Sequence, residues 1–371
     1  MKICLIAPIP PFRGGIAKYC HALAQELEKR HELLLLSYRR QYPALLYGNR
    51  QQIDDSFDRG RLAELFSNLS YDIDSLSIAS WAEIIHRIDA YSPDLVILPW
   101  WVTYWAPMYT WLMRRLRKRS IRYLLLCINV YEHEDSLLKK MVTRFVLRRA
   151  DMMIAHSGQE LTELQAINSK AAARGHLLPV FSYDRLASPC SGGSALNLLF
   201  FGFVREYKGL DLLLMGLAGL HDLDIQLKIV GEFWDGKEKY LNLIRELGLS
   251  GRVEIVDQYV TDVEMAQFFA WADLDVLPYR ASKTSGVIAT SYGFGKPVLA
   301  TDVGGFGEVV VDGLTGKLIK PGDQHAISEG IRWFYENRHI NFESNIASFV
   351  DQQMSWCSLV DTIEQMVENT A

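Results

Sequence analysis

The chain has 371 residues. A domain with a single hydrophobic core is usually smaller than this, so two domains are expected. Hydrophobic residues make up 49% and charged residues 22% of the chain, as in an ordinary soluble globular protein. The five cysteines lack metal-ligand spacing, and their odd number argues against a disulfide framework, so we expect a reducing, cytoplasmic compartment. The start MKICLIAP does not predict a signal peptide, and no apolar run reaches the roughly 20 residues that cross a bilayer.

The net charge of −5 hides a difference between the two halves of the chain. Residues 1–190 hold 25 Lys and Arg against 19 Asp and Glu, a net charge of +6. Residues 191–371 hold 14 against 25, a net charge of −11. This asymmetry predicts two domains that face different partners, unless it reflects only drift in surface composition.

The N-terminal half begins with a strand, a glycine loop and a helix. The strand is expected at Ile3–Ala7, the loop contains Gly14 and Gly15, and the amphipathic helix is expected from about 16 to 29. This order is typical of a nucleotide-binding α/β domain, but the absence of G-x-G-x-x-G disfavours a dinucleotide site. The two glycines form either a plain turn or a backbone loop that a ligand approaches closely. Residues 40–80 show no clear pattern.

Residues 99–111 are dense in aromatic side chains, including Trp100 and Trp101, and a basic cluster follows them. The cluster contains Arg114, Arg115, Arg117 and Lys118. Aromatic and basic residues side by side suit a membrane face, where apolar and anionic groups meet. The alternative is a core-packed helix with solvated arginines on its outer face. Core packing is favoured for the aromatic residues, and an anionic membrane surface for the basic cluster.

Two histidines follow strands further along this half. His133 lies in the polar segment NVYEHED after a strand expected at Arg122–Ile128, and His156 follows a strand expected at Asp151–Ala155. Open α/β sheets keep their sites at the carboxyl ends of strands, so both histidines are candidate site residues. The alternative is that each has only a structural role.

Residues 180–194 break the pattern, because Pro, Gly and Ser concentrate there without periodicity, so a linker is expected. A second series of alternating strands and helices follows. Its strands are expected at Leu196–Phe203, Ile225–Val230, Val253–Val256, Leu274–Leu277, Pro297–Ala300 and Leu318–Ile319. The expected fold class is therefore α/β, with two Rossmann-like parallel sheets. The two domains are expected at 1–185 and 195–345, followed by a C-terminal helix within 346–371.

The segment from Pro278 to Glu308 predicts an anion site. A buried strand ends at Pro278, and small residues then lead into an apolar helix. These small residues are Ser282, Thr284, Ser285 and Gly286. The first N–H groups of a helix have no partner within it, so we predict a diphosphate there. A tight turn that binds no ligand is the alternative.

Arg205 and Lys208 lie three positions apart, between a strand and a helix of the second series. At a helix start this spacing lets both side chains point the same way, beside the carboxyl ends of the sheet. Together with the helix start near Ser285 they would neutralise a diphosphate leaving group, as nucleotide-sugar chemistry requires. A metal ion is not expected, because the protein supplies these charges and the Asp-x-Asp sequences of the second half, at 222–224 and 273–275, lie where strands begin.

From about Leu196 to Pro321 the chain resembles the retaining glycosyltransferases of family four, the glycosyl transferases group 1, which have the two-domain GT-B fold. The resemblance rests on FFGFVREYKGLDLLL, IVGE, the DVLPY strand end, SGVIATSYGFGKPVLATDVGG, Glu308 and the DGLTGKLIKPGD turn, in this order. The N-terminal half is similar through Gly14–Gly15, NVYEHED and AHS. The resemblance implies two Rossmann-like domains facing a central cleft, with the nucleotide-sugar in the C-terminal domain and the acceptor in the N-terminal one. It also implies that the final helix returns to the N-terminal domain.

Carried to this sequence, the resemblance implies a role for each matching residue. Arg205 and Lys208 would bind the diphosphate and act in catalysis, with His133 near the reacting sugar or acceptor. The residues that would bind the donor are Gly14, Gly15, Glu232, Thr284, Ser285, Gly286, Val287 and Glu308. The candidates for the acceptor side are Trp100, Trp101 and His156.

The sequence departs from the family at two positions. Many members carry two glutamates eight positions apart, and this chain has Ser282 and Thr290 there. The carboxylates that usually contact the sugar and ribose hydroxyls are therefore absent at these two positions. Glu308 and Glu232 are the candidates to replace them.

The predicted activity is transfer, with retention, of a hexose-type sugar from a UDP- or GDP-sugar to a glycan or lipid-linked acceptor. The implied setting is cell-surface polysaccharide or lipopolysaccharide biosynthesis, in the cytoplasm or at the inner face of the membrane. No cofactor, metal ion or nucleic acid is expected. The leaving diphosphate would take the acceptor's proton, so no protein nucleophile is needed. The alternatives are a nucleotide-sugar epimerase of similar fold and a catalytically inactive GT-B scaffold in a polysaccharide assembly complex.

Overall fold

In the computed structural model, the described residues are 1–43, 52–53, 62, 64–131, 136–181, 195–283 and 286–369. The chain divides into two compact units. Unit 1 comprises Met1–His176 and Trp356–Ala371, and unit 2 comprises Leu177–Ser355. Unit 2 therefore begins before the predicted linker, most of which lies outside the described residues.

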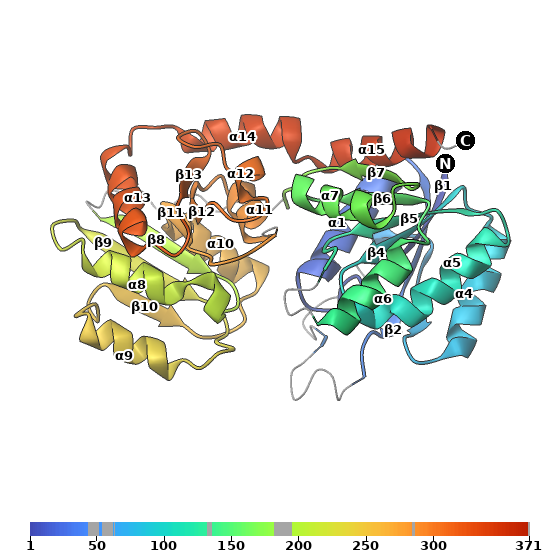
Figure 1. The fold of residues 1–371 in the computed structure, drawn as a ribbon, viewed down its shortest axis with the longest axis horizontal. Helices are drawn as coiled ribbons and strands as arrows, with labels where there is room; N and C mark the ends of the chain where they lie inside the picture. Colours follow the sequence, from blue (N-terminus) through green and yellow to red (C-terminus); the bar gives the residue numbers. More distant parts are fainter. Residues whose placement is uncertain are drawn as a thin grey trace. The chain divides into compact units, whose positions relative to one another are not determined.

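The described strands of unit 1 form one parallel sheet in the order β3-β2-β1-β4-β5-β6-β7 (Figure 1). They are β1 (Lys2–Ile6), β2 (Glu32–Arg40), β3 (Leu69–Asp74), β4 (Leu95–Trp100), β5 (Arg122–Cys127), β6 (Met152–Ala155) and β7 (Ala172–Gly175). The central strands are nearly continuous apolar runs, because a parallel sheet is covered by helices on both faces. The prediction of a parallel α/β sheet is confirmed for this unit.

Helices connect these strands. They are α1 (Gly15–Glu28), α4 (Ile78–Tyr91), the short η1 (Thr103–Trp105), α5 (Ala106–Arg117), α6 (Leu137–Leu147), α7 (Gly158–Ile167) and α15 (Trp356–Glu368). Ser77, Ser136 and Ser157 begin α4, α6 and α7, and each side-chain oxygen accepts a hydrogen bond from the N–H three residues later. These serines satisfy N–H groups that a helix start leaves unpaired.

The last helix, α15, packs on α1 within unit 1. Arg30, which follows α1, donates to Asp361 and to Glu364 at 2.6 Å each. Trp356 lies against Tyr19, with ring centroids 5.1 Å apart. The end of the chain thus packs in the unit where the chain begins.

Unit 2 contains a second parallel sheet, in the order β10-β9-β8-β11-β12-β13. Its strands are β8 (Leu196–Phe201), β9 (Ile225–Val230), β10 (Val253–Val256), β11 (Leu274–Leu277), β12 (Val298–Thr301) and β13 (Gly316–Ile319). Its helices are η2 (Glu206–Lys208), α8 (Leu210–Ala218), α9 (Glu238–Glu246), α10 (Asp262–Trp271), α11 (Gly286–Gly293), α12 (Phe306–Val309), α13 (Gln324–Glu336) and α14 (Phe342–Gln353). The second predicted parallel sheet is therefore confirmed.

The structure also contains elements that the sequence pattern does not predict. These elements are β3, which lies within the patternless residues 40–80, and also β7 and α14. β3 and β7 are the edge strands of their sheet. Edge strands carry polar residues, so they lack the continuous apolar runs from which strands were predicted.

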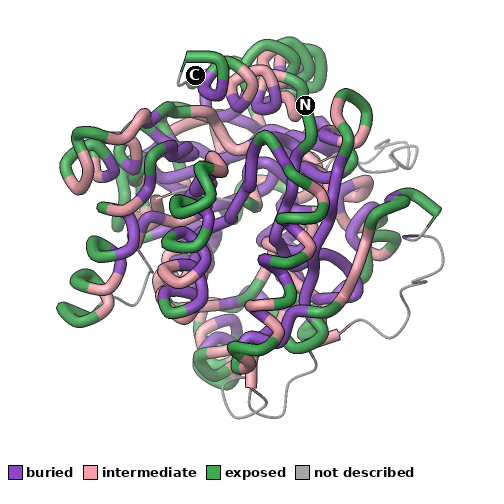
Figure 2. The backbone as a smooth tube through the Cα atoms, turned by 90° about the vertical axis from the view of Figure 1, so that its right-hand side faces the viewer, coloured by how far each residue is buried: buried purple, intermediate pink, exposed green. Residues whose placement is uncertain are grey.

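Strand order in unit 2 indicates where a ligand would bind. Burial is concentrated along the strands, whereas exposed residues lie mainly on helices and loops (Figure 2). The chain proceeds from β8 outward to β10 on one side, and from β11 outward to β13 on the other. β8 and β11 therefore form a switch point, and open α/β sheets bind ligands beyond the carboxyl ends of such strands.

Candidate functional site

The turn after β8, which carries Lys208, is held in place from the end of β11. Arg280 donates from its N–H to the carbonyl of Tyr207 at 2.7 Å, and from Nη1 to the carbonyl of Glu206 at 2.8 Å. Its guanidinium also forms a bidentate ion pair with Asp211, at 2.9 and 2.6 Å. A bidentate pair fixes direction as well as charge, so it holds this turn in one position.

The side chain of Lys208 is buried, with only 6% of the residue exposed. Its Nζ lies 5.5 Å from the centre of the Tyr279 ring, within cation–π distance. Burial lowers the pKa of Lys208 to about 8. The charge of Asp275 acts to raise this pKa, and the charge of Arg205 acts to lower it. A buried ammonium is costly without an anionic partner, so this is a favourable place for a negatively charged ligand.

Gly202, at the end of β8, leaves the space that the Lys208 ammonium occupies. A Cβ added at Gly202 would lie 2.9 Å from Lys208 Nζ, and the φ of Gly202 is +96°. Gly231, at the end of β9, has a φ of +143°, and its Cβ would lie 2.3 Å from the carbonyl oxygen of Gly202. Both positions therefore require glycine on grounds of conformation, and Gly231 also on grounds of space.

The start of α11 reaches the same point. Val287 Cγ2 lies 3.6 Å from the Cβ position of Gly202, so Lys208 Nζ and the first turn of α11 flank one glycine. Gly286 is the first residue of α11, where N–H groups have no partner within the helix. Thr284 and Ser285, predicted for this site, lie outside the described residues.

Arg205 and two aromatic residues form a further part of this edge of the sheet. Cζ of Arg205 lies 4.9 Å from the centre of the Trp234 ring, and the Phe203 ring lies 5.0 Å from it. Phe203 is 42% exposed, although it is large and apolar. The pair offers an aromatic surface beside a guanidinium. Phe203 stands within the motif FFGFVREYKGLDLLL, but Trp234 lies outside the quoted motifs, so the sequence does not indicate that the two rings meet.

Asp275 is the site residue that the sequence interpretation passed over. It lies on β11 with no exposed surface, and its Oδ2 accepts a 2.6 Å hydrogen bond from the hydroxyl of Ser291 on α11. The same hydroxyl lies 2.8 Å from the carbonyl oxygen of Val287, in the first turn of α11. Burial raises the pKa of Asp275 to about 7, while the Ser291 hydrogen bond and the charge of Lys208 lower it. A buried carboxyl group and a buried ammonium thus influence each other behind the switch point.

The positions where many family members carry acids lie nearby. Thr290 is buried in α11, and its Oγ1 donates to the carbonyl of Gly286 at 2.9 Å. Ser282 is half-buried after β11, Glu232 is half-buried after β9, and Glu308 is exposed on α12, after β12. The carboxyl ends of parallel strands meet at one edge of the sheet. Ser282, Glu232 and Glu308, which follow β11, β9 and β12, therefore share that edge with Lys208.

The candidates in unit 1 include a glycine pair and a histidine. Gly14 has a φ of +107° and precedes α1, whose first residue is Gly15. A Cβ added at either glycine would meet no described atom within 4 Å. The conformation of Gly14 therefore requires glycine, whereas packing does not. His133 lies outside the described residues.

The remaining unit 1 candidates are buried. His156 is 1% exposed, and its ring nitrogens lie 2.8 Å from the hydroxyl of Tyr19 and 2.8 Å from the carbonyl of His176. Burial lowers the pKa of His156 to about 4, so the ring is neutral at pH 7. Trp100 and Trp101 are 1% and 5% exposed, as core packing of the aromatic residues predicts. Burial leaves these three side chains little surface for a ligand, and their assignment to the acceptor side stays a prediction.

The predicted basic cluster lies at the C-terminal end of α5. It consists of Arg114, Arg115, Arg117 and Lys118. Arg117 donates to the hydroxyl of Tyr123 at 3.0 Å and to Asp151 at 2.9 Å. Arg115 lies over the Trp111 ring, at 4.9 Å from its centre. Part of the cluster is thus engaged within unit 1, and its charge also complements the C-terminal end of the α5 dipole.

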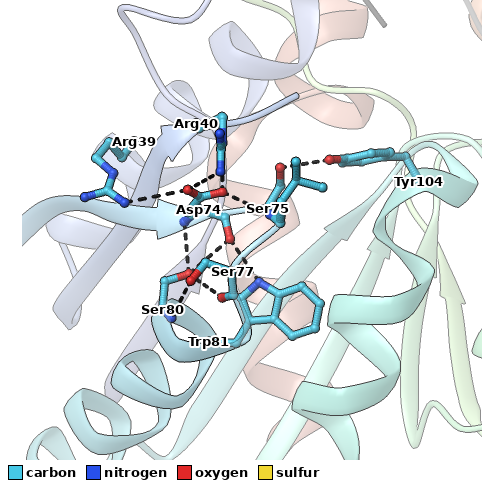
Figure 3. Close-up of polar contacts among 9 residues, drawn as sticks. Arg39, Arg40, Asp74, Ser75, Ser77, Ser80, Trp81 and Tyr104 are labelled. Atoms are coloured by element: carbon cyan, nitrogen blue, oxygen red, sulfur yellow. Dashed lines mark hydrogen bonds and ion pairs between the residues drawn. The ribbon is translucent and has the colours of Figure 1, made fainter. Parts of the chain in front are cut away.

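A polar network around Asp74 closes the carboxyl end of β3 (Figure 3). Asp74 is 6% exposed and accepts from Arg40 Nε at 2.9 Å and from Nη2 at 2.5 Å. Its carbonyl accepts from Ser80 Oγ and from Trp81 Nε1, both at 3.0 Å. Burial acts to raise the pKa of Asp74, but hydrogen bonds from Arg40 and from the N–H of Leu76 hold it below its usual value. These contacts join β2, β3 and α4, so the network stabilises unit 1.

The described part of the chain contains no group of three or more His, Cys, Asp or Glu side chains that could hold a metal ion. None of the described helices combines the length and hydrophobicity that crossing a bilayer requires.

Two family profiles match the chain, one in each unit. The profile described as Glycosyl transferases group 1 matches residues 195–337, and the profile described as Glycosyltransferase Family 4 matches residues 13–179. The chain belongs to the group 1 glycosyltransferases. The resemblance seen in the motifs is confirmed, and the second profile extends it to the N-terminal half.

Curated relatives match part of their own length. A D-inositol 3-phosphate glycosyltransferase of Catenulispora acidiphila is 30% identical over 210 residues, 50% of this chain and 49% of that protein. A lipopolysaccharide 1,2-N-acetylglucosaminetransferase of Salmonella typhimurium is 27% identical over 188 residues, 47% of this chain and 49% of that protein. The chain thus matches about half the length of these relatives.

Solved structures show the same fold along the whole chain. HepE of Anabaena, in complex with UDP and glucose, has a TM-score of 0.74 at 18% identity and is covered over 100% of both chains. Sucrose-phosphate synthase of Thermosynechococcus elongatus has a TM-score of 0.72 at 18% identity, over 100% of this chain and 98% of that one. At these identities the similarity concerns the fold alone, which is GT-B, as predicted.

Proposed function

We propose that this protein is a retaining glycosyltransferase that moves a hexose-type sugar from a UDP- or GDP-sugar to a glycan or lipid-linked acceptor. Unit 2 would hold the donor, and unit 1 the acceptor. One observation carries the proposal: the buried Lys208 ammonium lies beside the first turn of α11, at the switch point of the sheet. Such a site suits a diphosphate, since a buried cation and the positive end of a helix both favour an anion. The solved structure of HepE with UDP-glucose supports this ligand class.

In the proposed reaction the bond between the sugar C1 atom and the diphosphate oxygen breaks. The acceptor hydroxyl forms its bond to C1 on the same face, and its proton passes to the leaving diphosphate. Negative charge develops on the diphosphate, where Lys208, Arg205 and the start of α11 stabilise it. The protein supplies this positive charge itself, so we expect activity to persist in the presence of EDTA.

The biological setting follows from the relatives and is part of the proposal. One curated relative acts on lipopolysaccharide by its name, and one solved structure is a lipopolysaccharide outer core galactosyltransferase. These names support a role in cell-surface glycan synthesis, and we propose in addition that the protein is peripheral at the inner face of a membrane.

Two other functions make different predictions. A nucleotide-sugar epimerase of similar fold would convert a donor without any acceptor. An inactive scaffold would bind a nucleotide-sugar without turnover. The intact pair of Arg205 and Lys208 favours an enzyme.

Turnover of mixed UDP- and GDP-sugars, with and without glycan acceptors, tests the proposal. We expect Arg205→Ala and Lys208→Ala each to lower turnover by about two orders of magnitude or more, as loss of a transition-state charge does. Lys320→Ala, at an exposed position, serves as a control and should leave turnover unchanged. Near-normal rates in both site variants would rule out the assignment.

A further inference from the structure

Helix α6 exposes a stripe of large apolar side chains to solvent. They are Leu137, Leu138, Met141 and Phe145, at 83%, 69%, 67% and 51% exposed. At about 100° per residue, these four fall within an arc of about 100° around the helix axis. The opposite side of α6 is buried through Thr143, Val146 and Leu147. The helix is therefore held to unit 1 by one face and presents an apolar face to its surroundings.

Basic side chains border this apolar face. Lys140, Arg144 and Arg148 are all exposed, and no acidic residue occurs between 136 and 150. Lys140 and Arg144 lie one turn apart along one edge of the stripe, and Arg148 follows the last turn of the helix. An apolar stripe with a basic border is the composition of a helix that lies in the interface of a membrane.

We propose that α6 docks unit 1 onto an anionic lipid surface, with its apolar stripe among the acyl chains and its basic border against the lipid phosphates. Long basic side chains suit this position, because their stems are apolar and their charged ends reach the headgroups. A symmetric contact with a second copy of the chain is disfavoured, since it would bring two basic borders together. The proposal concerns a surface of unit 1, and it does not depend on the sugar transfer proposed above.

The structure favours α6 over the basic cluster of α5 as the docking element. Most apolar residues of α5 are buried in unit 1, among them Met108, Leu112 and Leu116, and the half-buried Trp111 lies under Arg115. Arg117 is engaged with Asp151. α5 therefore offers charge but no exposed apolar stripe, whereas α6 has both.

Flotation with lipid vesicles tests this proposal on the full chain. The vesicles are phosphatidylcholine alone, or phosphatidylcholine with one third phosphatidylglycerol. We expect binding to the anionic vesicles only, weakened by salt because salt screens the contribution of charge. The double variant Leu137→Gln/Met141→Gln should lower affinity by at least about tenfold, as loss of two inserted apolar side chains does. Both positions are largely exposed, so the fold should be retained, and circular dichroism checks this.

A matched control removes two exposed apolar side chains from unit 2. Val263 and Leu314 are 69% and 54% exposed, and Val263→Gln/Leu314→Gln should bind vesicles like the unchanged protein. Lys140→Ser/Arg148→Ser should lower binding to anionic vesicles, which tests the basic border. No binding by the unchanged protein, equal binding to both kinds of vesicle, or full binding by the folded α6 variants would overturn the proposal.

Discussion

The hydroxyl of Ser291 donates a 2.6 Å hydrogen bond to Oδ2 of Asp275, and neither residue has any exposed surface. The bond joins α11, whose start forms part of the candidate anion site, to β11 beneath it. The pKa of Asp275 is raised by burial to about 7, so its charge changes near neutral pH. That charge acts on Lys208, whose own pKa burial lowers to about 8. Perturbed groups that influence each other in this way are typical of functional sites.

Asp275→Asn is expected to move the alkaline limit of activity to lower pH. The charge of Asp275 raises the pKa of Lys208, and the amide removes that charge. Lys208 would then lose its proton at a lower pH, and with it the positive charge that the diphosphate requires. Below about pH 7 the wild-type carboxyl group is itself protonated, so the two proteins should behave alike there. The pH profile of turnover, measured from pH 6 to 9, checks both halves of this prediction.

Ser291→Ala provides a second route to the same change. The hydrogen bond from Ser291 lowers the pKa of Asp275, so its loss should keep Asp275 neutral to higher pH. The alkaline limit should again move to lower pH, by less than in Asp275→Asn. A purely structural role would reduce turnover equally at every pH, and such a uniform loss would contradict the prediction.

Asp275 also illustrates why part of the site could not be predicted from sequence. In the sequence it lies in an Asp-x-Asp segment at a strand start, where an acid was not expected to reach the site. The register of β11 instead pairs Asp275 with Leu199 on β8, and α11 returns over it sixteen positions later with Ser291. This burial depends on packing between elements, and periodicity carries no signal for it.

Gly202→Ala is expected to lower turnover by at least roughly tenfold. The new Cβ would lie 2.9 Å from Lys208 Nζ and would strain a backbone with a φ of +96°, so the ammonium would have to shift from its place beside α11. Displacing one charge that stabilises the leaving group is enough for such a loss. Gly248→Ala is the matched control, because Gly248 has a φ of +67° and a Cβ there meets no described atom within 4 Å. It should lose about 1 kcal/mol of stability from backbone strain and keep its turnover. Equal losses of turnover in the two variants would contradict the assigned role of Gly202.

Trp234→Ala is expected to raise the KM for the donor by roughly tenfold, whereas Trp234→Phe should keep most of the affinity. The Trp234 ring lies under the guanidinium of Arg205 and beside Phe203, so its loss leaves Arg205 less well positioned. Trp333, on α13, lies under Lys317 at a similar distance, 4.7 Å. Trp333→Ala should therefore alter stability without raising the KM. An unchanged KM in Trp234→Ala would exclude this role for the ring.

Some of this arrangement could be predicted from the sequence, and the reasons are local. Apolar runs that alternate with helices identify both parallel sheets, and Arg205 and Lys208 stand in one strand–turn–helix segment. Phe203 and Trp234 belong to two different strand ends, 31 positions apart, so only the pairing of β8 with β9 brings them together. His156 follows a strand as a site residue would, but its neighbours are Tyr19 and His176, which the sequence does not indicate.

His156 is expected to make unit 1 less stable in acid. Burial lowers its pKa from 6.5 to about 4, so between these values the unfolded chain binds a proton that the folded chain does not. This group's contribution is complete above pH 6.5 and is lost as the pH falls, by about 3 kcal/mol at pH 4. Urea unfolding of His156→Phe should therefore show a smaller fall in the free energy of unfolding between pH 7 and 4.5. Tyr19→Phe removes a hydroxyl that contacts the ring but retains the imidazole, so it should be less stable and keep most of the wild-type pH dependence. The same pH dependence in wild type and His156→Phe would show that His156 is not the group responsible.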